Sequence, residues 1–140
     1  MSVFEILLPV FALIALTFGL MFSMGFLRVR ATMTREVRIK DIALGQSAWP
    51  PAILKFDRAF HNQLELPMLF YILIVLVLVT RNGDILLSVL SWLFVALRYA
   101  HAFVHTTSNN VPRRFQLFAA GAVVLLVMWA LFAVKIAFAY

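Results

Sequence analysis

The chain has 140 residues, of which 64% are hydrophobic and only 13% are charged. A soluble domain is about half apolar, so this composition excludes a water-soluble globular protein and predicts an integral membrane protein. The net charge is +6, and most of the basic residues lie in or beside two predicted loops, without a nucleic-acid-binding pattern. The absence of cysteine excludes disulfides, protein thiolates and Cys-ligated metals.

Four segments are apolar over the roughly 20 residues that a membrane helix needs, at about 3–27, 52–79, 85–104 and 115–138. The first contains Glu5 instead of an initial positive charge and is as long as a full span, so we expect it to persist as a helix and not to be cleaved as a signal peptide. The four spans take up most of the chain and predict one transmembrane domain over 1–140. The expected fold is all-α, an integral membrane four-helix bundle with short connections.

Positive charge is distributed unevenly over the predicted loops. The first loop and its borders carry seven basic residues, the third loop carries Arg113 and Arg114, and the second carries only Arg81. By the positive-inside tendency the first and third loops face the cytoplasm, where basic residues also meet anionic lipid headgroups. We expect the protein to reside in a bacterial inner membrane in this orientation.

The second span begins with a cluster of polar residues. Arg58, Asn62 and Glu65 are spaced i, i+4, i+7 and would form a narrow stripe on one helix. An acid about three turns into a membrane helix needs a partner, which makes the stripe a candidate functional site. Pro67 cannot donate to the carbonyl of Gln63 and is expected to kink the helix there. An intrahelical Arg58–Glu65 pair with a snorkelling arginine is the alternative interpretation.

The third span offers a matching polar face. Arg98, His101 and His105 are spaced i, i+3, i+7, and Arg113 and Arg114 follow near the same membrane surface. The combined charge is mostly positive, with one acid from the second span. Since arginines bind carboxylates bidentately and the acid would take an ammonium, the pattern favours an anionic ligand with a free amino group.

A metal site is a competing interpretation of the histidines. His101 and His105 are four residues apart, which can direct two imidazoles at one ion, and Glu65 or His61 would have to complete the site. Zinc sites usually have three or four protein ligands, so helix packing or ligand contact explains two histidines better, and we expect no metal.

The stretch Arg58-Ala59-x-x-Asn62-x-x-Glu65, followed by Pro67, resembles a signature of the MAPEG family, the membrane-associated proteins in eicosanoid and glutathione metabolism. The resemblance extends over essentially the whole chain. It includes the four spans, the arginine-ended first span, the long basic first loop, and the segments "RYAHAFVH" and "PRRFQLFAAG".

The resemblance implies a homotrimer with glutathione bound between adjacent subunits near the cytoplasmic face. It assigns Arg58, Asn62 and Glu65 to the tripeptide, with help from Arg28 or Arg30. An arginine at the start of the fourth span, here Arg113 or Arg114, would stabilise the thiolate. A tyrosine that some members carry in the third span is replaced by His105 or Phe103, and Tyr99 lies one turn earlier. The expected site is completed by Arg98, Tyr99 and His105.

The implied function is a membrane-bound glutathione transferase or peroxidase that acts on a lipophilic small molecule. The alternative is a non-catalytic scaffold of the same fold that binds lipid or serves as a small subunit of a larger membrane complex. The arginine at the start of the fourth span favours the enzyme, because a scaffold has no thiolate to stabilise.

Overall fold

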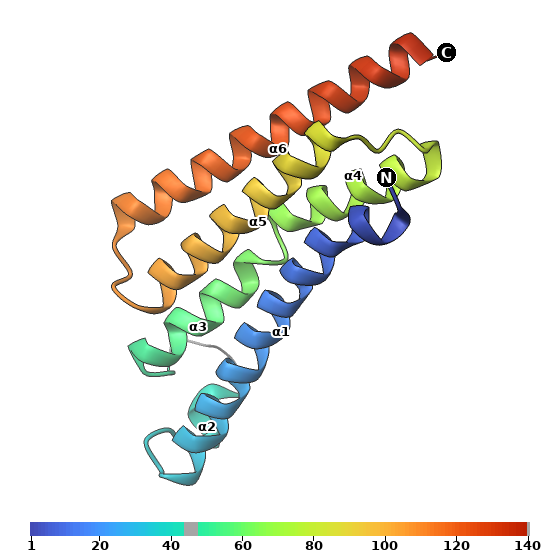
Figure 1. Ribbon diagram of the computed structural model, residues 1–140. Coiled ribbons are helices and arrows are strands. Elements are labelled where there is room, and N and C mark those ends of the chain that lie inside the picture. Colours follow the sequence, from blue (N-terminus) through green and yellow to red (C-terminus); the bar gives the residue numbers. More distant parts are fainter. Residues whose placement is uncertain (44–47, 140) are drawn as a thin grey trace.

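The structure is a computed structural model and describes residues 1–43 and 48–139. Helices are the only regular secondary structure among those residues: α1 (Val3–Met33), α2 (Ile39–Ile42), α3 (Pro51–Asn62), α4 (Leu66–Thr80), α5 (Ile85–Thr106) and α6 (Val111–Ala139). Four helical stretches are long and apolar enough to cross a membrane, α3 and α4 together making the second. The predicted all-α four-helix bundle is confirmed (Figure 1).

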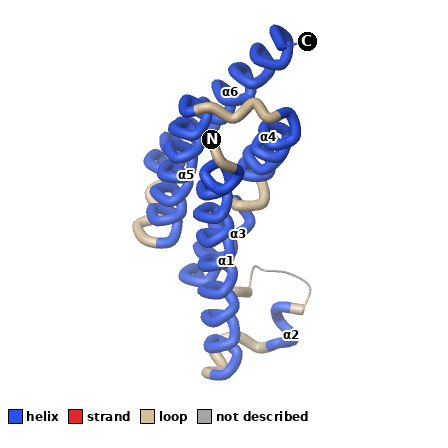
Figure 2. Tube along the Cα trace, turned by 45° about the vertical axis from the view of Figure 1, so that its right-hand side comes forward, coloured by secondary structure: helices blue, strands red, loops and turns tan. Residues whose placement is uncertain are grey.

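The spans pack as an antiparallel bundle. α5 lies along α6, α1 packs against α3 and α5, and α4 contacts both α1 and α6. One end of the bundle is formed by the end of α1, the start of α3, the end of α5 and the start of α6 (Figures 1 and 2). Both chain termini lie at the other end. We call the first of these the basic end, because it carries the basic residues of the first and third loops.

The core lies between the four spans. Leu13 of α1, Phe70 of α4, Phe94 of α5 and Met128 of α6 are all fully buried there. The rings of Phe70 and Phe94 stack with centroids 4.9 Å apart. Large apolar side chains also cover the outer faces of the helices, as expected for a surface in contact with lipid or with neighbouring subunits.

Two spans extend further than their hydropathy predicts. α1 continues to Met33 instead of ending near residue 27, so Arg28 and Arg30 lie inside the helix. α6 begins at Val111 instead of near residue 115, with Pro112 in its first turn. Hydropathy marks where a span meets charge, whereas helical hydrogen bonding continues through arginines whose long side chains reach the interface.

The second predicted span, 52–79, is not one continuous helix. α3 ends at Asn62 and α4 begins at Leu66, and the N–H groups of Gln63, Leu64 and Glu65 donate to carbonyls three residues back. Pro67 lies buried in the first turn of α4, where its missing N–H requires no partner. The expected kink is therefore a full break, and Glu65 is displaced from the helical stripe of Arg58 and Asn62.

The first loop packs partly against the bundle. Ala31, Val37, Trp49 and Ile53 form a small buried apolar cluster at the basic end. α2 is a single short helix within this loop. Residues 44–47 of this loop lie outside the described part of the chain.

Asp84 joins two helices at the end opposite the basic end. One carboxylate oxygen accepts from the Leu87 N–H at 2.9 Å and caps α5, and the other pairs with the Lys135 ammonium of α6. Partial burial alone would raise the pKa of Asp84, but the hydrogen bonds from Lys135 and Leu87 outweigh it and hold that pKa below its ordinary value.

We expect Asp84→Ala to lower the free energy of unfolding by about 1 kcal/mol through loss of the cap, and Asp84→Asn to lower it less. Because the folded state lowers the pKa of Asp84, its contribution is complete above the unfolded pKa of about 3.8 and is lost as the pH falls through the lower folded pKa. Thermal unfolding in detergent, followed by circular dichroism at neutral and acid pH, measures both effects.

Asp41→Asn is the matched control, since it removes an exposed carboxylate from the short helix α2. A stability loss in Asp41→Asn equal to that in Asp84→Ala would show that the effect follows net charge and not the cap.

Candidate functional site

The break between α3 and α4 interrupts the predicted polar stripe. Arg58 lies on the exposed face of α3, Asn62 ends that helix, and Glu65 is exposed at the break. Gln63 between them is buried, and both amide atoms lack a hydrogen-bond partner among the described residues. The spacing predicted that Glu65 continues the stripe of Arg58 and Asn62 on one helix; the break places it instead between α3 and α4, where its side chain is exposed in the single chain.

Arg98 is the most deeply buried cation at this level, with 1% of its surface exposed. Its Nη2 donates to the Asn62 side-chain oxygen at 2.5 Å and to the Asn62 carbonyl at 3.4 Å. Nε and Nη1 have no partner within the described part of the chain. A buried guanidinium held only by neutral oxygens retains donors for an anion.

A hollow of about 300 Å³ lies between the break and the start of α6; Arg98 is not in its lining but bonds to Asn62, which is. We call it the α6 hollow. Its lining combines polar and apolar side chains, so it suits a ligand with charged groups and an apolar part. Its lining residues are Asn62, Glu65, His101, Val111, Arg114, Phe115 and Phe118.

Arg113 and Arg114, the two arginines at the start of α6, lie in different surroundings. Arg114 is half-buried, lines the α6 hollow, and donates from Nη1 to the Asn109 side-chain oxygen at 2.5 Å. Arg113 is exposed and is not part of that lining; its backbone N–H donates to the Asn110 side chain at 3.1 Å. Of the two candidates, Arg114 is the cation beside the hollow.

Arg28 is occupied by a partner that the sequence analysis missed. Its Nη2 donates to the carboxylate of Asp57, which is 2% exposed, and its guanidinium lies over the Trp49 ring at 5.2 Å. The available signal was the spacing of Ile53 and Asp57, four residues apart on the buried face of α3. Arg30 is exposed and lines a separate hollow formed by α1 and the start of α3.

Tyr99 and His105 lie away from the α6 hollow. The Tyr99 hydroxyl donates to the Ala12 carbonyl of α1 at 2.6 Å. His105 is buried and reaches a smaller hollow of about 120 Å³, which we call the α3 hollow. The lining of the α3 hollow consists of Pro51, Leu54, Lys55, Arg58, His105 and Asn109.

No group of three or more His, Cys, Asp or Glu side chains within 1–43 and 48–139 is arranged to hold a metal ion. The two buried histidines instead face aromatic rings. The ring centroids of His101 and His105 are 5.6 Å apart, and His101 lies 6.2 Å from Phe118.

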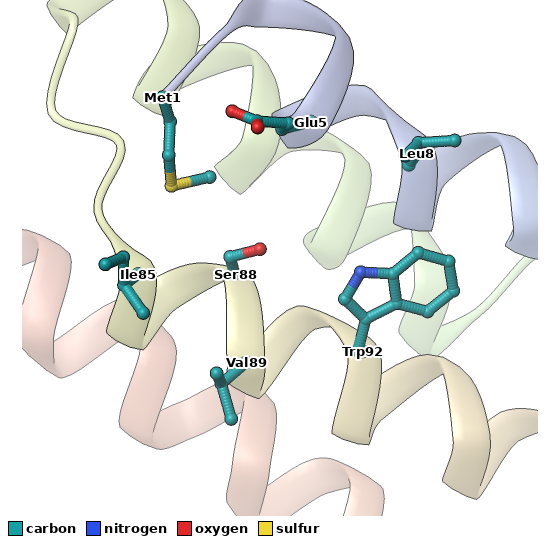
Figure 3. Close-up of a pocket in the computed structure, with 7 residues that line it drawn as sticks. All are labelled: Met1, Glu5, Leu8, Ile85, Ser88, Val89 and Trp92. Atoms are coloured by element: carbon teal, nitrogen blue, oxygen red, sulfur yellow. The ribbon is translucent and has the colours of Figure 1, made fainter.

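A larger hollow, of about 500 Å³, lies at the opposite end of the bundle between α1 and α5 (Figure 3). Its only charged side chain is Glu5, whose carboxylate already accepts from the Ser2 N–H at 2.7 Å in the cap of α1. This hollow is larger than the α6 hollow, but its lining has no guanidinium to bind a carboxylate bidentately, and the acid Glu5 offsets the α-ammonium of Met1. We therefore assign the site to the α6 hollow.

The chain matches the MAPEG family model over residues 6–134. No curated protein and no solved structure matches the chain. The family match extends from α1 to the last turns of α6 and includes every residue of the α6 hollow. Because this match covers most of the sequence and the four apolar helices suit a membrane bundle, the protein is an integral membrane protein that belongs to the MAPEG family.

Proposed function

We propose that the protein is a membrane-bound glutathione transferase or glutathione-dependent peroxidase that acts on lipophilic substrates. The observation that carries this proposal is the α6 hollow, whose lining combines Arg114, Asn62 and Glu65 with apolar side chains, and whose Asn62 holds the incompletely paired Arg98. Membership of the MAPEG family supports the same assignment.

Glutathione has two carboxylates, one ammonium and one thiol, and the residues at the break match these groups. Arg98 has two guanidinium nitrogens without a partner among the described residues, and Arg58 is exposed on the same helix end as Asn62. Guanidiniums bind carboxylates in a planar, bidentate way, and Glu65 is the acid that would accept the ammonium. The charge pattern therefore supports a zwitterionic ligand with a negative net charge.

Assembly would complete this site. Arg58 and Glu65 are exposed on a single chain, at the level where a membrane helix should present apolar side chains to lipid. Charged groups within a membrane span face protein or water, because lipid cannot solvate them. A homotrimer, with the exposed stripe of one subunit covered by its neighbour, is the arrangement we propose.

The chemistry proposed for the chain is electrostatic. A cation beside a thiol stabilises the thiolate, and the thiolate is the nucleophile. Arg114 fits this role because it lines the hollow. Glutathione would supply the sulfur that this cysteine-free chain lacks, and Val111 and Phe115, both exposed and apolar, would admit a substrate that partitions into the membrane.

A non-catalytic scaffold that binds lipid, or a small accessory subunit of a larger complex, is the second candidate. The engagement of Arg28 by Asp57 and of Tyr99 by Ala12 favours it, because both residues then serve packing and not a ligand. In either case we propose that the basic end faces the cytoplasm of a bacterial inner membrane, with anionic headgroups as its lipid contacts.

Glutathione binding should depend on Arg58. A charge-assisted hydrogen bond contributes about 1.5–3 kcal/mol, so Arg58→Ala is expected to weaken binding roughly tenfold or more. Arg58→Lys should have an intermediate effect, since it keeps the charge but loses the planar fork. Glu65→Gln should also weaken binding by removing the ammonium partner. Titration calorimetry on detergent-purified protein measures all three.

Arg81→Lys is the control for Arg58→Lys, because Arg81 lies in the turn at the opposite end of the bundle. Unchanged affinity in the Arg58 variants would contradict the ligand assignment.

Thiolate formation should depend on Arg114 and not on Arg113. On addition of glutathione at neutral pH, we expect the ultraviolet absorbance of a thiolate in the wild-type protein and in Arg113→Ala. Arg114→Ala, and the double variant, should lose this absorbance because no cation then borders the hollow. Glutathione binding without any thiolate absorbance in the wild-type protein would support the scaffold.

The oligomeric state is directly measurable. Native mass spectrometry in a mild detergent is expected to show three chains, because a monomer leaves Arg58 and Glu65 exposed at membrane depth. Detection of monomer alone across several mild detergents would refute the assembly.

A further inference from the structure

Two buried histidines lie between two separate hollows. His101 lines the α6 hollow and His105 lines the α3 hollow, and the two hollows share no lining residue. The histidines are 3% and 4% exposed and lie one turn apart on α5. The two side chains therefore lie in sequence between the interior of one hollow and the interior of the other.

The ring nitrogens between the hollows are not used in packing. His101 Nδ1 and both ring nitrogens of His105 are buried without a hydrogen-bond partner in the described part of the chain. The rings are nearly perpendicular, at 82°, with centroids 5.6 Å apart. Polar atoms in such a position are normally satisfied by ordered water. The pair therefore has the components of a hydrogen-bonded chain.

The charged side chains around the two rings come from three helices. Arg98 precedes them on α5, Arg58 and Lys55 line the α3 hollow with His105, and Arg114 lines the α6 hollow with His101. Glu65 is the acid of that lining, and no described carboxylate forms an ion pair with either ring. Neither histidine therefore has the anionic partner that would hold a proton in place.

The two hollows also differ in where they open. The α6 hollow is bordered by the exposed apolar side chains of Val111 and Phe115. The α3 hollow lies among Lys55, Arg58 and Asn109 at the basic end, where the Lys55 ammonium donates to the Thr107 carbonyl at 3.1 Å. The α3 hollow therefore offers a proton formed beside Val111 and Phe115 a polar exit at the basic end.

From this geometry we infer that His101 and His105 form a proton route from the α6 hollow to the α3 hollow. His101 takes up a proton at one ring nitrogen and releases one from the other. His105 repeats the exchange and delivers the proton to water at the basic end. The electron pair of the broken S–H bond stays on sulfur, one proton enters and one leaves, and both rings regain their tautomers by exchange with water. The inference rests on the proposed function, which supplies the thiol proton.

The test follows proton release directly. Wild-type protein in weakly buffered detergent solution is mixed with glutathione in a stopped-flow instrument, and a pH-indicator dye and the thiolate absorbance are recorded together. His101→Gln and His105→Gln are expected to slow proton release at least tenfold, since an amide cannot exchange protons between two nitrogens. Free imidazole is expected to restore the rate in His105→Ala, whose side chain borders an open hollow. Thermal unfolding confirms that the variants are folded.

His61→Gln is the matched control, because His61 is half-exposed on the surface of α3 and should leave the rate unchanged. If the wild-type protein releases a proton and both glutamine variants match its rate, the route is overturned while the proposed function stands. A slowing that imidazole does not reverse assigns the histidines to packing and also overturns the route. If the wild-type protein gives neither signal, the proposed function fails, and the route fails with it.

Discussion

The architecture of the basic end depends on the interruption of the second membrane span between Asn62 and Leu66. In a membrane an unpaired backbone group costs several kcal/mol, so a helix can break only where protein groups replace the lost hydrogen bonds. Here three successive N–H groups bond to carbonyls three residues back, Pro67 has no N–H to satisfy, and Arg98 reaches the Asn62 carbonyl. The break thus creates both the polar surroundings of Arg98 and the outward position of Glu65.

Arg28, which is half-buried, and Arg98, which is fully buried, have different hydrogen-bond partners. Arg28 is neutralised by Asp57 and covered by Trp49, which ties α1 to α3. Arg98 is held by the neutral oxygens of Asn62 and keeps two nitrogens without a partner among the described residues. Removing a buried charge's partner is strongly destabilising, so Arg28 is committed to structure. Arg98, in contrast, retains capacity for an anion, and this difference separates the structural cations from those available to a ligand.

The α6 hollow combines features that a single helix could not provide. Asn62 and Glu65 come from the break, His101 from α5, and Arg114 and the apolar side chains from α6. This mixture of polar and apolar lining residues is what the proposed reaction, between a charged thiol peptide and a membrane-soluble molecule, would need. The exposed side chains of Glu65 in this hollow and of Arg58 in the neighbouring α3 hollow are the reason for the proposed homotrimer.

The sequence by itself determined the membrane class, the four spans, the polar residues of the second and third spans and the family resemblance. These follow from hydropathy, helical spacing and a local motif, all of which are properties of neighbouring residues. Only the tertiary structure decided that Asp57 is the buried acid, that Arg114 and not Arg113 borders the hollow, and that Tyr99 bonds to α1. Each of these depends on which helix faces which, and a break of three residues in the second span rotates every side chain that follows. The spacing of residues along the sequence cannot predict such a rotation, because the rotation is set by packing against the other helices.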